Sequence, residues 1–198
     1  WDSEVKQSQR INKYKEVLNS LINKQLVYPC FEDPEELHLK RKAQLSSGKP
    51  PIYDRKSLNL NDKEIEEKIS KGKKPHYRFL LKNEKIIWDD LVRGECSLDT
   101  SSVSDPIIVR EDGRFIYTLA SVVDDSNFDI THIIRGEDHV TNSAVQIQIF
   151  KALKSNIPKM GHLSLMTDID GGGLSKRIGS LSINELKKQN IEPQALTS

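Results

Sequence analysis

Large hydrophobic residues recur three or four positions apart near the start of the chain, between residues 4 and 24. They are Ile11, Tyr14, Leu18 and Leu21. This spacing places them on one face of a helix, with polar residues on the other faces. The pattern predicts an amphipathic helix that packs against a core.

Two further helices are indicated by their start and stop signals. Asp33 can cap a helix whose first residue is Pro34, and Gly48 suits the end of that helix. A short charged helix is expected over residues 62–70, where Gly72 would stop it. Both predictions rest on local chemistry rather than on a hydrophobic face.

Short β-prone runs are spread over the rest of the chain. Those at residues 77–81, 86–88 and 107–109 alternate with charged segments, so the middle of the chain is expected to be α+β. The runs at residues 116–123 and 130–134 are mainly apolar. They predict two strands.

A helix is expected directly after the second of these strands, over residues 143–153. A third apolar run, residues 163–166, leads to the glycines 171–173, and residues 182–185 have the spacing of a capping box for a last helix. Strand, helix and strand in this order are typical of an α/β fold with a parallel sheet.

The composition is that of a globular protein, because 36% of the 198 residues are hydrophobic and 30 basic residues against 29 acidic ones leave a formal charge of +1. A local basic patch could still bind nucleic acid. No apolar run approaches the roughly 20 residues of a membrane helix and no leader opens the chain, so we expect a cytoplasmic protein with no membrane partner. Cys30 and Cys96 are expected to be reduced thiols.

Residues 134–139, Ile-Arg-Gly-Glu-Asp-His, follow an apolar strand and form the first candidate site. Ligands of open α/β sheets bind beyond the carboxyl ends of strands, where the planar guanidinium of Arg135 can hold a carboxylate or a phosphate. The alternative is a polar loop whose charges face water or pair with each other.

Residues 171–177, Gly-Gly-Gly-Leu-Ser-Lys-Arg, form the second candidate site. Backbone N–H groups and a lysine suit a polyphosphate, whose oxygens gain charge during phosphoryl or nucleotidyl transfer. The spacing of a P-loop is absent, and an exposed turn with solvated charges is the alternative.

Asp124 and Asp125 could act as general bases, bind a metal or cap a turn, and the following Ser-Asn favours the turn. The five histidines have no H-x-H or H-x-x-x-H spacing, so no metal site is predicted from them.

Short motifs along the whole chain stand in the order and spacing of one family. They are Trp1-Asp2, residues 6–10 (KQSQR), 28–31 (YPCF), 34–37 (PEEL), 48–54 (GKPPIYD), 105–106 (DP), 112–113 (DG), 134–140 (IRGEDHV) and 174–177 (LSKR). Together they resemble bacterial-type glutamyl-tRNA synthetases. The chain is therefore identified as a member of the class I aminoacyl-tRNA synthetases.

The resemblance implies a partial class I Rossmann-type catalytic domain of α/β class, with an inserted α+β connective domain. Residues 1–24 would end the first half of the catalytic domain, and residues 25–115 would form the insertion near the tRNA acceptor end. Residues 116–168 would be the second half, and residues 169–198 would carry the signature loop and the start of the stem-contact region.

The implied reaction attaches glutamate to tRNA through a glutamyl-adenylate, with ATP and its accompanying Mg²⁺. Arg135 resembles the family's binder of the amino-acid carboxylate, and Tyr117 falls at a substrate-contacting tyrosine. Ser121 stands where the family usually has an asparagine that contacts the amino acid. The partners implied are tRNA, glutamate and ATP, and the oligomeric state is left open.

The signature loop supplies the implied ATP site. Lys176 matches the family's catalytic lysine, with Ser175 and Arg177 beside it as further ATP-binding residues. Gly173 replaces the usual first lysine of the loop. The family's His-Ile-Gly-His element is absent from these residues, so we expect an internal fragment that is inactive alone.

Some relatives bind zinc in the insertion through Cys-x-Cys and Cys-x-His pairs. Here Cys30 is followed by Glu32, and Ser57 and Asn59 stand at the second pair, so no structural zinc is expected. Two rival functions stay open. The parent enzyme could charge glutamine tRNA with glutamate, or the chain could be a non-catalytic RNA-binding relative.

Overall fold

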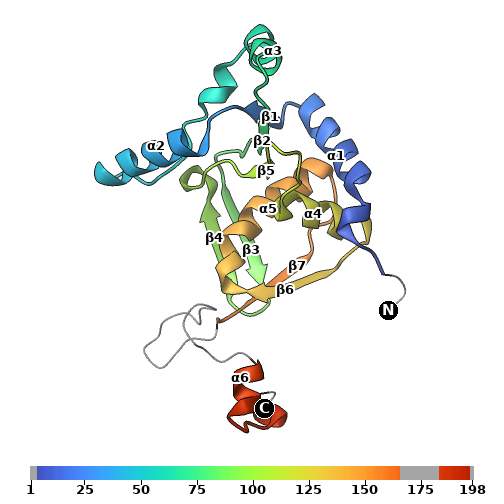
Figure 1. Cartoon of the computed structure of the whole chain (residues 1–198). Coiled ribbons are helices and arrows are strands. Elements are labelled where there is room, and N and C mark those ends of the chain that lie inside the picture. Colours follow the sequence, from blue (N-terminus) through green and yellow to red (C-terminus); the bar gives the residue numbers. More distant parts are fainter. Residues whose placement is uncertain (1–3, 166–182, 197–198) are drawn as a thin grey trace.

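The computed structural model describes residues 4–165 and 183–196, which form two sheets and the helices around them (Figure 1). The first sheet is antiparallel, in the order β1-β2-β5, with β1 (Val27–Cys30), β2 (His76–Phe79) and β5 (Ile107–Val109). The second sheet has the order β4-β3-β7-β6, with β3 (Lys85–Asp90), β4 (Gly94–Asp99), β6 (His132–Gly136) and β7 (Lys159–Leu163).

The helices of the described residues are α1 (Ile11–Asn23), α2 (Pro34–Ser46), α3 (Asp62–Ser70), α4 (Tyr117–Asn127), α5 (Val140–Leu153) and α6 (Ile183–Lys188). Short 3-10 turns lie at Gln7–Gln9, Lys56–Asn59, Thr100–Ser102, Glu137–His139 and Pro193–Leu196. Within the described part of the chain, no helix has the length and apolar character needed to cross a membrane.

The helix predicted from hydrophobic spacing is α1, which buries Tyr14, Leu18 and Leu21. Ile11 is the exception, because it begins the helix and is 45% exposed. Tyr14, Leu18 and Leu21 join one hydrophobic core that extends through α4, α5 and residues of both sheets. The predicted packing of this helix is therefore confirmed for three of the four hydrophobic residues, and Ile11 is the one that is not buried.

The helices predicted from their caps are confirmed as α2 and α3. Asp33 accepts a hydrogen bond from the backbone N–H of Glu36 at 2.8 Å, and Pro34 is the first residue of α2. The backbone of Gly48 has a φ of +71°, which is why a glycine follows this helix end. The last helix is found as α6, whereas Ser182 of its predicted capping box lies outside the described residues.

The three predicted β pieces in the middle of the chain are confirmed as β2, β3 and β5, with ends shifted by a few residues. The sequence reading missed β1 and β4. Strand β1 contains Pro29, which has no backbone N–H, and β1 is an edge strand of its sheet. Proline is tolerated at such an edge because one side of the strand needs no partner.

The prediction of a strand over residues 116–123 is wrong, because this segment begins α4. The buried residues are Leu119, Ala120, Val122 and Val123, which follow the spacing of a helix face rather than the alternation of a strand. The β-branched side chains of Val122 and Val123 favour a strand locally, but α4 packs between α1 and α5 and buries this face. Tertiary packing overrides the local preference.

The predicted parallel unit is confirmed as β6, α5 and β7, in which His132–Gly136 pairs in parallel with Lys159–Leu163. The third apolar run was expected at 163–166, but the strand ends at Leu163. Helix α5 packs against α4 and against β3 and β4 (Figure 1). This double coverage explains why all residues from 143 to 150 are buried.

Strands β3 and β4 extend the sheet of the parallel unit. They form an antiparallel hairpin, and Asp90 at the end of β3 pairs in parallel with Met160 of β7. On α5, the side-chain amide of Gln148 accepts from the backbone N–H of Lys82 at 2.9 Å and donates to its carbonyl at 3.0 Å. These contacts fix the segment that links the two sheets.

Candidate functional site

Arg135 lies near the carboxyl end of β6, and its guanidinium donates three hydrogen bonds to side chains. Nη1 donates to the hydroxyl of Tyr117 at 2.9 Å, and Nη2 donates to Oγ of Ser143 at 2.6 Å. Nε donates to Nε2 of His162 at 3.3 Å. The two parallel strands and the starts of α4 and α5 therefore meet at this one side chain.

The other predicted amino-acid-binding residues lie on the first turns of α4. Tyr117 is 47% exposed, and its ring lies 5.7 Å from the ring of His139. Ser121 donates a hydrogen bond to the carbonyl of Tyr117 at 2.6 Å and accepts one from Nε2 of Gln146 at 2.9 Å. The structure thus brings Tyr117, Ser121 and Arg135 together.

Asp90 and His162 lie behind Arg135 and are buried. Oδ2 of Asp90 lies 2.5 Å from Nδ1 of His162, and Nε2 of His162 lies 2.8 Å from Oγ of Ser143. Burial alone would raise the pKa of Asp90, but hydrogen bonds from His162 and from backbone N–H groups outweigh it and hold this pKa well below its usual value. Asp90 therefore stays ionised next to His162.

The sequence reading missed Asp90, Ser143, Gln146 and His162. Ser143 and Gln146 lie in a buried, mainly apolar stretch of α5, and both are at most 1% exposed. Polar residues inside a buried helical stretch need hydrogen-bond partners, so this pattern was a usable signal. Asp90 and His162 lie 72 residues apart and gave no such signal.

The charged residues around Arg135 agree in part with the polar-loop alternative. Glu137 pairs with Arg93 at 2.5 Å and the pair is exposed, whereas Arg135 is half-buried in the network described above. The signature-loop residues Ser175, Lys176 and Arg177 lie outside the described residues. Their part in the site stays a prediction.

Asp124 does not end a strand, and its carboxylate connects α4 to the first helix of the chain. It accepts hydrogen bonds from Tyr14 at 2.7 Å, from Arg10 at 2.7 Å and from Gln7 at 3.0 Å. The guanidinium of Arg10 also lies over the ring of Phe128, 4.6 Å from its centroid. Asp124 thus serves neither as a turn cap nor as part of the Arg135 cluster.

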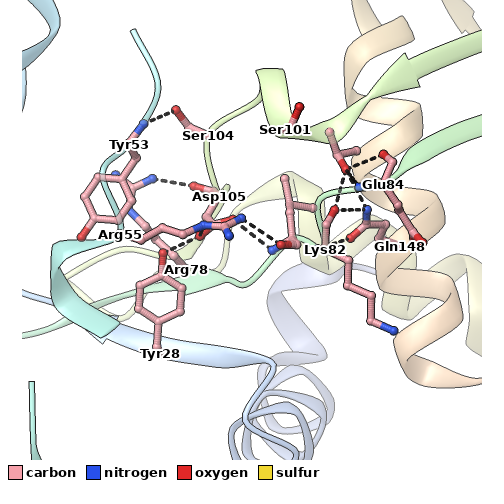
Figure 2. Close-up of polar contacts among 12 residues, drawn as sticks. Tyr28, Tyr53, Arg55, Arg78, Lys82, Glu84, Ser101, Ser104, Asp105 and Gln148 are labelled. Atoms are coloured by element: carbon pink, nitrogen blue, oxygen red, sulfur yellow. Dashed lines mark hydrogen bonds and ion pairs between the residues drawn. The ribbon is translucent and has the colours of Figure 1, made fainter. Parts of the chain in front are cut away.

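A cavity of about 620 Å³ lies between α2 and the antiparallel sheet. Its wall is built around Asp105, which is buried and accepts hydrogen bonds from Arg55 at 2.9 and 2.8 Å and from the hydroxyl of Tyr28 at 2.6 Å (Figure 2). Arg78 lies 4.1 Å from the centroid of the Tyr53 ring and donates to the carbonyl of Asp105 at 2.6 Å. The cavity wall therefore has fixed charges.

The structure brings a third candidate metal ligand to Cys30 and Glu32. Cys30 is the register partner of His76 across the sheet, and one ligand atom from each of the three lies within 4.8 Å of the others. Oε1 of Glu32 already accepts hydrogen bonds from Tyr53 at 2.6 Å and Ser57 at 2.9 Å. Structural zinc sites usually have four protein ligands. Within the described ranges this cluster offers three, one fewer than usual, and the absence of structural zinc stays a prediction.

Comparison with known proteins shows which family the chain resembles. The model of the family described as tRNA synthetases class I (E and Q), catalytic domain, matches residues 1–198. Glutamate–tRNA ligase 2 of Hyphomonas neptunium is 51% identical over 198 residues, which are 100% of this chain and 44% of that protein. Glutamate–tRNA ligase 1 of Rickettsia massiliae is 51% identical over 199 residues, with the same shares. The chain spans less than half the length of these relatives.

Solved structures show the same likeness. A glutamate tRNA ligase of Elizabethkingia meningosepticum, in complex with its amino acid, matches with a TM-score of 0.79 and 28% identity, over 89% of this chain and 37% of that one. A glutamate–tRNA synthetase of Elizabethkingia anophelis matches with a TM-score of 0.77 and 28% identity, over 88% of this chain and 38% of that one.

Proposed function

This chain belongs to the catalytic-domain family of the class I tRNA synthetases for glutamate and glutamine, and we propose that the whole protein attaches glutamate to tRNA with ATP. The observation that carries the proposal is the Arg135 cluster at the carboxyl ends of the parallel strands β6 and β7. Arg135 and the exposed Tyr117 face each other there at 2.9 Å. This is the edge at which ligands of such sheets bind.

The amino acid would bind through its carboxylate and its neighbouring polar groups. In the proposal Arg135 holds the carboxylate of glutamate, and Tyr117 contacts the same substrate beside it. Ser121 has a shorter side chain than the family's asparagine and would reach the amino acid through a water molecule. Its hydrogen bond from Gln146 keeps the hydroxyl in place for that contact.

The proposed chemistry has two steps. The α-carboxylate of glutamate attacks the α-phosphate of ATP and expels pyrophosphate, and a terminal ribose hydroxyl of tRNA then takes the glutamyl group and releases AMP. Lys176 would stabilise the charge that develops on the pyrophosphate, with Ser175 and Arg177 beside it. Magnesium would enter with ATP, as part of that substrate.

The division of the chain and the location of the reaction belong to the same proposal. Residues 25–115 would approach the tRNA acceptor end, and the exposed Arg41 at the cavity next to α2 suits a phosphate backbone. Residues 1–24 and 116–168 would belong to the catalytic domain, and residues 169–198 to the loop and stem-contact region. The reaction would take place in the cytoplasm.

The test uses the full-length protein with labelled glutamate, ATP, Mg²⁺ and purified glutamate and glutamine tRNAs in parallel reactions. Labelled glutamate on glutamate tRNA alone is the expected result. Glutamate on glutamine tRNA would show that the enzyme feeds a later amidation step. No labelling of either tRNA would overturn the proposal in favour of a non-catalytic RNA-binding protein.

A further inference from the structure

His162 and Ser143 contact Arg135 from its buried side, and Asp90 contacts His162. We propose that these three buried side chains position Arg135 for the amino-acid substrate. The inference rests on the proposed role of Arg135 in binding glutamate. The three residues come from the end of β3, from β7 and from α5. None of them would touch the substrate, so they are positioning residues rather than catalytic ones.

The hydrogen-bonding capacity of arginine determines the protonation state of His162. A guanidinium has donors only, so Nε2 of His162 must accept the hydrogen bond from Nε of Arg135. Nδ1 then carries the proton and donates a hydrogen bond to Oδ2 of Asp90. His162 is therefore neutral with its proton on Nδ1, and this tautomer matches the requirements of Arg135.

Ser143 has the same kind of role on the other side of the guanidinium. Its Oγ accepts a hydrogen bond from Nη2 of Arg135 at 2.6 Å. Its own proton can then go to Nε2 of His162 at 2.8 Å or to the carbonyl of His139 at 3.3 Å. Nε and Nη2 are thus anchored from behind, while Nη1 contacts the exposed Tyr117.

The orientation of Asp90 is fixed by the backbone. Its Oδ1 accepts hydrogen bonds from the N–H groups of His162 at 3.0 Å and of Val92 and Arg93 at 3.1 Å each. An asparagine at this position would place its carbonyl oxygen at these three donors. Its NH₂ group would then face Nδ1 of His162 and act as a donor toward it.

The variant Asp90→Asn therefore reverses the tautomer of His162 with little change in shape. Nδ1 would become the acceptor and Nε2 would carry the proton, so two N–H donors would oppose each other between His162 and Arg135. In other enzymes with an Asp–His pair, an Asn at the aspartate selects the wrong tautomer in the same way. Arg135 would lose its anchor and shift from the position that the carboxylate requires.

The experiment measures aminoacylation by the full-length protein at saturating tRNA and its D90N and S143A variants. We expect the KM for glutamate to rise about 10- to 100-fold in D90N, as for a displaced binding group. The KM for ATP should change less than about twofold. S143A removes one acceptor and should raise the KM for glutamate in the same direction, and it keeps the test valid if D90N does not fold.

The matched control is Asp105→Asn, which neutralises another buried carboxylate that accepts a backbone N–H, from Leu81 at 3.0 Å. It should lower thermal stability and leave the KM for glutamate unchanged. A folded D90N or S143A variant with a wild-type KM for glutamate would overturn the positioning role. A KM for glutamate that rises equally in D105N would also overturn the positioning role.

Nitrogen NMR of histidine-labelled protein provides a second readout that does not depend on activity. Wild type should show His162 neutral, with its proton on Nδ1, and D90N should show the proton on Nε2. A protonated Nε2 in wild type overturns the inference even if the enzyme charges tRNA. If wild type charges no tRNA while the NMR signals are as expected, the proposed function has failed and the buried network stands.

Discussion

Tyr14 on α1 donates a hydrogen bond from its hydroxyl to Asp124 on α4 at 2.7 Å, and this bond connects the first helix of the chain to the helix that begins the candidate site. Burial of Tyr14 and the bond to Asp124 raise the pKa of the phenol to about 12. Because this pKa is raised on folding, the protonated phenol stabilises the native state below a pH of about 10, the unfolded value. This contribution is lost as the pH rises through about 12.

Tyr14→Phe should lower the free energy of unfolding by about 1 kcal/mol at pH 7, because Asp124 loses one donor. The difference between wild type and variant should shrink as the pH rises above about 10, since only wild type has the phenol that titrates. Urea unfolding at several pH values measures both effects. Two stability curves that stay parallel up to pH 11 would contradict the coupling between Tyr14 and Asp124.

Arg135→Lys should raise the KM for glutamate by roughly 10²-fold in the full-length enzyme, because an ammonium group cannot reproduce three directed hydrogen bonds from one planar group. The charge is kept, so the change tests geometry. Arg93→Lys is the matched control, since Arg93 makes an exposed pair with Glu137 near the same loop. Equal effects of the two substitutions on steady-state kinetics would exclude a special role for Arg135.

Lys176→Ala should lower the rate of glutamate activation by roughly 10²-fold or more, by analogy with the loss of other groups that stabilise transition-state charge. The KM for glutamate should change little, because this lysine is proposed to act on the phosphates. Lys187→Ala on α6 serves as the control for removal of an exposed lysine charge. A drop of less than twofold in single-turnover activation would rule out the proposed role.

The purified full-length protein should contain no stoichiometric zinc at the Cys30 cluster, and a chelator should leave its melting temperature unchanged. The reason is the donor set, because three candidate ligands are one fewer than structural zinc sites usually have. Elemental analysis of wild type and Cys30→Ser gives the answer. One zinc per chain, lost in the variant, would refute this prediction and assign the unpartnered Oε2 of Glu32 and Nε2 of His76 to the metal.

Helix ends and motif spacing could be predicted from the sequence because they depend on near neighbours. Asp33 and Gly48 mark the start and end of α2 through their own hydrogen bonding and backbone freedom. The position of Arg135 near the carboxyl end of a strand was likewise readable, although the strand runs to Gly136 rather than ending at Ile134. The motif series led to the right family for the same reason.

The remaining features of the fold and of the candidate site depend on tertiary contacts. Residues 116–123 have β-branched side chains that favour a strand, yet packing against α1 and α5 makes them a helix. Cys30 meets His76 only through the register of two strands, and Asp90 meets His162 only because β3 lies beside β7. Such contacts join residues far apart in the chain, and the backbone brings them together when apolar surface is buried. Neighbouring residues in the sequence therefore determine the helix caps, the motifs and the position of Arg135. Only the tertiary structure brings the buried groups that hold Arg135 next to it.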